Sequence, residues 1–183
     1  MRIIAGRFKG HRLVAFKANH IRPTTDRVKE TIFNKIQSHI PGAKVLDLFS
    51  GTGSLGLEAL SRGAESVQFV DSHAKSIHIL NQNVDKLDVR GSVSISKVDV
   101  LRFLKQAEDS FDLIFIDPPF TKKMGEEVMQ TLAQSKVFHA QSLILIESTK
   151  HENMQDHYLE LERIDVKSFG DKDLSVFSQV EGK

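Results

Sequence analysis

The stretch SGTGSLG, residues 50–56, carries glycines at Gly51, Gly53 and Gly56, in the spacing G-x-G-x-x-G. Glycines at this spacing let a strand turn sharply into a helix while backbone N–H groups approach a ligand closely. Many nucleotide-binding folds share the spacing, those of nicotinamide-dependent oxidoreductases among them. It therefore predicts a backbone geometry and leaves the reaction open. Residues 50–53, which begin at Ser50, are called the glycine loop below.

Three aspartates are spaced to serve a nucleotide bound at this loop. Asp71 ends the segment FVD, 20 residues beyond Gly51, where a carboxylate can accept hydrogen bonds from both ribose hydroxyls. Asp99 follows the next apolar segment and suits either the exocyclic amine of adenine or a plain turn or helix cap. Asp47 lies inside the apolar run VLDLF, where a charge is costly unless it is paired or faces a ligand. It suits orienting the glycine loop from behind or meeting the charged amino-acid tail of a cofactor.

The motif DPPF, Asp117 to Phe120, favours chemistry on an exocyclic amine. Its two prolines fix an extended strand exit and remove two N–H groups, which leaves acceptors. Asp117 and the Pro118 carbonyl can each accept one N–H of an amine. Phe120 offers a face for base stacking, worth about 1–3 kcal/mol in comparable sites. A hydride-transfer enzyme has no use for this arrangement; the structural alternative is a strand terminator with a core phenylalanine.

The elements that must position these residues alternate between strand and helix. We expect strands at 44–49, 66–71, 92–99, 111–117 and 142–148, and helices at 52–62, 74–87, 101–107 and 124–135. Alternation at this spacing predicts an α/β fold, a parallel sheet with helices on both faces. The end of the chain, residues 158–180, instead alternates apolar and polar residues around Gly170. It predicts an antiparallel hairpin at one sheet edge.

The first residues are basic. Residues 1–35 hold nine Lys and Arg against two acidic residues, although the whole chain carries a net charge of only +1. Residues 2–15, called the N-terminal hairpin below, are expected to form two short strands around the turn GRFKG. A helix from Thr25 or Asp26 should follow, with Val28, Ile32, Phe33 and Ile36 on its apolar face. Such a segment suits a polyanion-binding edge, or a merely solvated terminus.

The composition of the chain excludes several kinds of functional site and of protein. The chain has no cysteine, which removes disulfides, thiolate catalysis and Cys-based zinc sites together. No apolar run approaches the roughly 20 residues that span a bilayer, and charges and glycines interrupt the first ten residues. The eight histidines show no metal-ligand spacing, so no metal is expected. The expectation is a cytoplasmic protein without a membrane partner.

At this point the chain resembles a known family. The segments DLFSGTGSLGLEALSRGA, FVD, KVD and DPPF, in this order, are similar to those of the S-adenosylmethionine-dependent amino-methyltransferases of the class I Rossmann-like fold. GRFKGHRL followed by RPTTDRVKETIFN narrows the resemblance to the RsmD family. These are bacterial methyltransferases that act on the N2 amine of a guanine in 16S ribosomal RNA. The resemblance covers nearly the whole chain.

The resemblance implies a mostly parallel seven-stranded sheet with an antiparallel C-terminal hairpin. It implies a basic N-terminal hairpin extension at residues 1–20 and a methyltransferase domain at residues 21–183. S-adenosylmethionine would be held by Asp47, Ser50, Gly51, Gly53, Asp71, Asp99, Val100 and Thr24. The target guanine would meet Asp117, Pro118 and Phe120. The RNA backbone would meet Arg7, Lys9, His11, Arg12, Arg22 and Lys122.

The expected substrate is thus 16S rRNA within the small ribosomal subunit or its assembly intermediate, and the expected enzyme is a monomer. Other amino-methyltransferases, acting on another RNA, on DNA adenine or on a protein amide, share the motif DPPF or its close variants. DNA adenine and protein amides give the basic N-terminal segment no clear use. A non-catalytic RNA-binding protein would not need DPPF intact.

Overall fold

The computed structural model describes residues 1–16, 26–119 and 124–180. Within these ranges eight strands form one sheet: β1 (Lys44–Leu48), β2 (Ser66–Val70), β3 (Val93–Ser96), β4 (Leu113–Ile116), β5 (Leu143–Thr149), β6 (His157–Tyr158), β7 (Leu161–Phe169) and β8 (Lys172–Gln179). The helices that the same ranges contain are α1 (Asp26–Lys35), α2 (Ser54–Ser61), α3 (Ala74–Leu87), α4 (Val100–Gln106) and α5 (Gly125–Ala133), with short 3₁₀ turns at Gln37–His39 and Arg90–Ser92.

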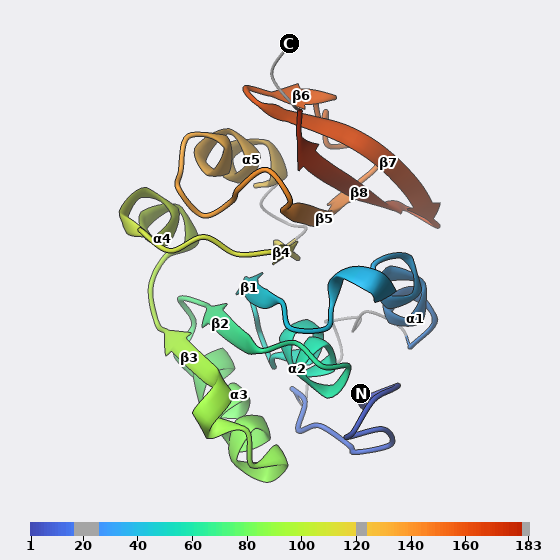
Figure 1. Ribbon diagram of the computed structural model, residues 1–183, viewed down its shortest axis with the longest axis vertical. Helices are drawn as coiled ribbons and strands as arrows, with labels where there is room; N and C mark the ends of the chain where they lie inside the picture. Colours follow the sequence, from blue (N-terminus) through green and yellow to red (C-terminus); the bar gives the residue numbers. More distant parts are fainter. Residues whose placement is uncertain (17–25, 120–123, 181–183) are drawn as a thin grey trace.

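The strands follow the order β3-β2-β1-β4-β5-β8-β7-β6 (Figure 1). The pairs among β1 to β5 are parallel, and β5–β8, β8–β7 and β7–β6 are antiparallel. The predicted parallel sheet and C-terminal hairpin are confirmed. The sheet has an eighth strand because the two residues of β6 pair with the start of β7.

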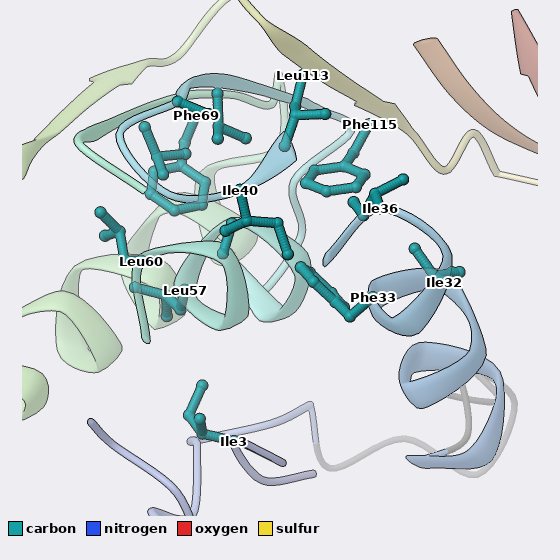
Figure 2. Packing of buried hydrophobic residues seen from close by; sticks show 14 of the residues in the cluster. Ile3, Ile32, Phe33, Ile36, Ile40, Leu57, Leu60, Phe69, Leu113 and Phe115 are labelled. Carbon is teal, nitrogen blue, oxygen red and sulfur yellow. The ribbon is translucent and has the colours of Figure 1, made fainter. Parts of the chain in front are cut away.

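Helices cover both faces of the parallel part, which explains why β4, between β1 and β5, is apolar throughout. All four residues of β4 are buried, as expected for a strand covered on both sides. Neighbouring residues of β1 enter different cores, since Val45 packs with α1, α2 and α3 and Leu46 packs with α4 and α5. Figure 2 shows part of the first core, where Phe33 of α1 lies near Phe115 of β4.

The N-terminal hairpin belongs to this first core. Ile3 and Leu13 are buried in it, and Ile3 points toward α2 in Figure 2. The two arms do pair as a hairpin, since the Ile3 N–H donates to the His11 carbonyl and the Leu13 N–H donates to the Met1 carbonyl. They share only one isolated bridge, between Arg2 and Arg12, and are not regular strands. Several of its backbone groups instead pair with side chains of α2 and α3. The expected boundary between residues 20 and 21 lies outside the described residues.

Candidate active site

The site lies where the strand order reverses. β1 is bordered by β2 on one side and by β4 on the other, and Leu48 is in register with both Val70 and Ile116. Phe49, Asp71 and Asp117 therefore leave their strands at the same level of the sheet. In open α/β sheets, ligands bind in the crevice outside such strand ends. The topology thus brings the glycine loop, Asp71 and Asp117, the first residue of DPPF, to one end of the parallel strands.

The glycine loop makes the predicted sharp turn. The Ser50 N–H donates to the Val70 carbonyl over 3.1 Å, and the Gly53 N–H donates to the Ser50 carbonyl over 2.7 Å. Gly51 and Gly53 have φ values of 54° and 79°, a region that favours glycine. Phe49 also has a positive φ, 58°, which is strained for a bulky residue. No sequence pattern indicates this last feature.

Asp71 ties the end of β2 to the glycine loop. Its Oδ2 accepts the Gly51 N–H over 2.9 Å and its Oδ1 accepts the His73 N–H over 2.7 Å. The side chain is nearly buried. Each carboxylate oxygen has capacity for a second hydrogen bond, so the geometry suits the predicted contact with ribose hydroxyls. That contact stays a prediction.

Asp47 supports the glycine loop from below. Its Oδ2 accepts the Gly56 N–H in the first turn of α2 over 2.9 Å, and the residue is only 2% exposed. Burial raises the pKa of Asp47 to about 7; the Gly56 hydrogen bond opposes this shift, and the charges of Asp117 and Asp71 add to it. This observation supports the role of orienting the loop from behind. A contact with a cofactor's amino-acid tail stays a prediction.

The DPPF segment begins directly after β4. Pro118 is buried, Pro119 is exposed, and Asp117 is half-buried beside the glycine loop. The Asp117 N–H donates to the Leu48 carbonyl at 3.5 Å, at the end of the β1–β4 ladder. Four other predicted site residues lie outside the described residues: Arg22, Thr24, Phe120 and Lys122.

Asp99 caps α4. Its Oδ1 accepts the Arg102 N–H over 3.1 Å, which is the N-cap geometry. Val100 is the first residue of the helix, where an N–H has no intrahelical acceptor. The helix-cap alternative for Asp99 is thus observed, and adenine binding by Asp99 and Val100 remains a prediction.

The predicted RNA-binding residues of the N-terminal hairpin lie on its surface. Arg7, Lys9, His11 and Arg12 are all exposed. The Arg7 guanidinium stacks over the Phe8 ring at 4.4 Å, and His11 Nδ1 lies 2.9 Å from the Phe8 carbonyl oxygen. The hairpin lies beside α2 in Figure 1. The hairpin that carries these cations therefore adjoins the helix that follows the glycine loop.

Three buried polar residues that no sequence motif marks join the hairpin to this helix layer: Lys29, Glu58 and Asn83. The sequence does indicate a special role for Glu58, because a single charge inside the apolar helix segment LGLEAL is costly to bury unless it is paired. Lys29 and Asn83 lie on the amphipathic helices α1 and α3, where a polar residue is unremarkable in sequence. Their contacts depend on the tertiary fold.

Two kinds of feature are not found in the parts of the chain that the structure describes. Residues 1–16, 26–119 and 124–180 hold no cluster of three or more His, Cys, Asp or Glu placed to bind a metal ion. In those same ranges, no helix is both long and apolar enough to cross a membrane.

Sheet order, the loop after β1 and DPPF after β4 together define a class I methyltransferase fold. A solved Escherichia coli structure, assigned as the methyltransferase yhhF, superposes with a TM-score of 0.88. It is 30% identical to this chain and covers 98% of it, and the chain covers 97% of that protein.

Sequence comparison gives the family. Residues 1–178 match the family described as "Conserved hypothetical protein 95". Ribosomal RNA small subunit methyltransferase D of Haemophilus influenzae is 37% identical over 82% of this chain and 79% of its own length. The protein of the same name from Escherichia coli is 35% identical over 81% of this chain and 74% of its own length. The chain belongs to this family, the RsmD family that its motifs resemble, and it is a methyltransferase.

Proposed function

We propose that the protein transfers a methyl group from S-adenosylmethionine to the exocyclic N2 amine of a guanine in 16S ribosomal RNA. The observation that carries the proposal is the position of DPPF. Asp117 leaves β4 at the level where the glycine loop leaves β1. An acceptor pair for an amine thus borders the predicted cofactor loop. The names of the relatives supply the RNA, and the RsmD resemblance supplies the guanine N2.

The residues of the loop fit S-adenosylmethionine. Ser50 Oγ is buried and has no hydrogen-bond partner among the described residues, and such a hydroxyl is costly unless a ligand meets it. A Cβ on Gly51 would meet nothing closer than 3.9 Å, so a ligand can approach the loop backbone there. Asp71 would hold the ribose, and Asp99 with the Val100 N–H would meet the adenine. Asp47 would balance the positive charge of the methionine part.

The cofactor supplies a methyl group that its sulfonium already makes electrophilic, so the protein needs no covalent nucleophile. The task of this chain is alignment, and positioning of this kind can supply about 7–11 kcal/mol. Asp117 and the Pro118 carbonyl accept the two N–H groups of the guanine amine, which directs the nitrogen lone pair toward the methyl group. The amine becomes more acidic as it attacks, and Asp117 or water takes its proton.

The base must leave its stack to reach this site, which favours an exposed nucleotide over one inside a continuous helix. The exposed cations of the N-terminal hairpin, Arg7, Lys9 and Arg12, suit the phosphates around that nucleotide. We place the reaction in the cytoplasm, on the small subunit or its assembly intermediate, with the enzyme as a monomer.

The test is methyl transfer. The protein is incubated with labelled S-adenosylmethionine and small ribosomal subunits from cells that lack the gene, and nucleosides are identified by mass spectrometry. Label in N2-methylguanosine, lost in Asp117→Ala, is the expected result. Asp88→Asn, an exposed carboxylate at the C-terminal end of α3 to which no site role is assigned, serves as the control for the loss of one negative charge. Cofactor binding without label in rRNA would overturn the substrate and direct the search to DNA adenine and protein amides.

A further inference from the structure

Glu58 of α2 holds the first arm of the N-terminal hairpin. It is fully buried, and its two oxygens accept the Ile4 N–H over 2.8 Å and the Ala5 N–H over 2.9 Å. A helix side chain thus supplies acceptors that a partner strand would supply in a regular sheet. The first arm is therefore fixed to α2, the helix that begins at the glycine loop.

Two cations complete the surroundings of Glu58. Lys29 Nζ lies 3.0 Å from its Oε2, and Arg62 Nε donates to its Oε1 over 2.8 Å. Lys29 also donates to the Arg2 carbonyl over 2.7 Å and to Ser54 Oγ at 3.3 Å. Burial lowers the pKa of Lys29, and the charge of Glu58 opposes this shift. One ammonium group thus joins the hairpin, Glu58 and the residue that follows the glycine loop.

Asn83 of α3 holds the second arm in a similar way. Its Oδ1 accepts the Val14 N–H over 2.7 Å, and its Nδ2 donates to the Val14 carbonyl over 3.1 Å. The same Nδ2 donates to the Thr52 carbonyl, inside the glycine loop, over 2.9 Å. Asn83 is also fully buried. Each arm of the hairpin is therefore bound by a buried polar side chain that belongs to the framework of the loop.

The turn between the arms is held just as closely. Gly6 has a φ of 79°, and a Cβ there would lie 1.8 Å from the Ser61 carbonyl oxygen. That carbonyl accepts the Arg7 N–H over 2.8 Å. Arg7, an exposed cation of the turn, is thereby placed by a backbone bond to α2.

We propose that Glu58 and Asn83 are positioning residues that hold the cationic hairpin at a fixed place relative to the glycine loop and so set the affinity for the RNA substrate. The inference rests on the proposed function. A buried ion pair is a weak source of stability, since apolar residues of similar volume often replace one without loss. What this arrangement supplies is fixed geometry between phosphate contacts on the hairpin and the site of methyl transfer. Preorganisation of this kind strengthens binding by removing the cost of ordering the contact segment.

The experiment uses Glu58→Gln in the full chain. The amide keeps one acceptor for the Ile4 and Ala5 N–H groups and replaces the other with a donor. We expect faster hydrogen exchange at these two amides. We also expect the dissociation constant for small subunits lacking the modification, and KM for the same substrate, to rise about tenfold. The dissociation constant for S-adenosylmethionine, measured by calorimetry without RNA, should change by less than about twofold.

Asp112→Asn is the matched control. Asp112 also accepts a backbone N–H from a distant segment, that of Lys44 over 2.7 Å. It precedes β4, however, and so lies at the end of the strands opposite to the candidate site. This variant should leave subunit affinity unchanged whatever its melting temperature. Asn83→Leu is the second test if Glu58→Gln does not fold, and it should speed exchange at Val14 and weaken subunit binding.

Two results would overturn the positioning role: faster exchange at Ile4 and Ala5 with unchanged subunit affinity, or an equal loss of affinity in Asp112→Asn. Failure of the proposed function is a separate outcome. A wild-type protein that binds subunits but transfers no methyl group would overturn the reaction, and the binding constants of the variants would still decide the positioning role. A wild-type protein that does not bind subunits would overturn both.

Discussion

Replacing Asp47 with asparagine should change how the stability of the protein depends on pH. Burial raises the pKa of Asp47 from 3.8 to about 7 in the folded protein. The folded state therefore holds the proton more tightly than the unfolded chain does. Stability contributed by the protonated carboxyl is lost as pH rises from about 4 to about 7, and little further change is expected above that.

The magnitude follows from the width of this interval. Each pH unit within it costs about 1.4 kcal/mol in the free energy of unfolding. Between pH 5 and pH 8 the interval covers two units, from 5 to 7, so the wild-type protein should lose about 3 kcal/mol through Asp47. Asparagine keeps an acceptor for the Gly56 N–H, which Asp47 binds at 2.9 Å, and it does not titrate. Between pH 5 and pH 8, the free energy of unfolding of Asp47→Asn should therefore rise by about 3 kcal/mol relative to that of the wild type.

Urea denaturation at pH 5, 6, 7 and 8, without cofactor, measures the difference. Asp99→Asn removes an exposed carboxylate near the same edge and reports the effect of losing one negative charge alone. The absolute offset between Asp47→Asn and the wild type is less informative, because the buried amide group of asparagine has its own cost of about 1–3 kcal/mol. Unfolding free energies that run parallel for Asp47→Asn and the wild type from pH 5 to pH 8 would refute the reasoning.

Two further predictions concern local geometry. Asp99→Ala should lower the free energy of unfolding by about 1 kcal/mol, because the Arg102 N–H loses the side chain that caps it, whereas Asp99→Asn should lower it little. Urea denaturation midpoints measure the difference, and equal losses of stability in the two variants would contradict the capping role. Gly6→Ala should lower the melting temperature much more than Gly10→Ala: both glycines have a positive φ, but a Cβ at Gly6 meets the Ser61 carbonyl and one at Gly10 meets nothing within 4 Å. Similar losses in the two variants would show that backbone strain alone sets the cost.

The sequence predicts most of the fold because its strands are short, apolar and separated by amphipathic helices. The helix expected at residues 74–87 is α3, Ala74–Leu87, without correction. Strand ends were equally clear, since Gly51, Asp71 and Asp117 all follow apolar runs. The parallel arrangement then brings them to one edge, so the outline of the site could be predicted as well.

The N-terminal hairpin shows what local patterns miss. Residues 2–15 suggest two strands, yet the arms share only one bridge, and further backbone groups of both arms bond to side chains of other elements. Their partners, Glu58 and Asn83, are 53 or more residues away in the chain. The positive φ of Phe49 could not be predicted either, because a bulky residue rarely adopts it and no local pattern marks it.

The far end of the sheet bears on how the protein avoids aggregation. β6 pairs only with Leu161 and Glu162, so among the described residues no strand covers the outer side of the rest of β7. That stretch exposes Ile164 and Val166, and a bare apolar edge can recruit a strand from another chain. The irregular register between Arg163 and Asp165 interrupts the edge, and a charged side chain, Lys167, follows. Local irregularity and charge together make this edge a poor template for a foreign strand.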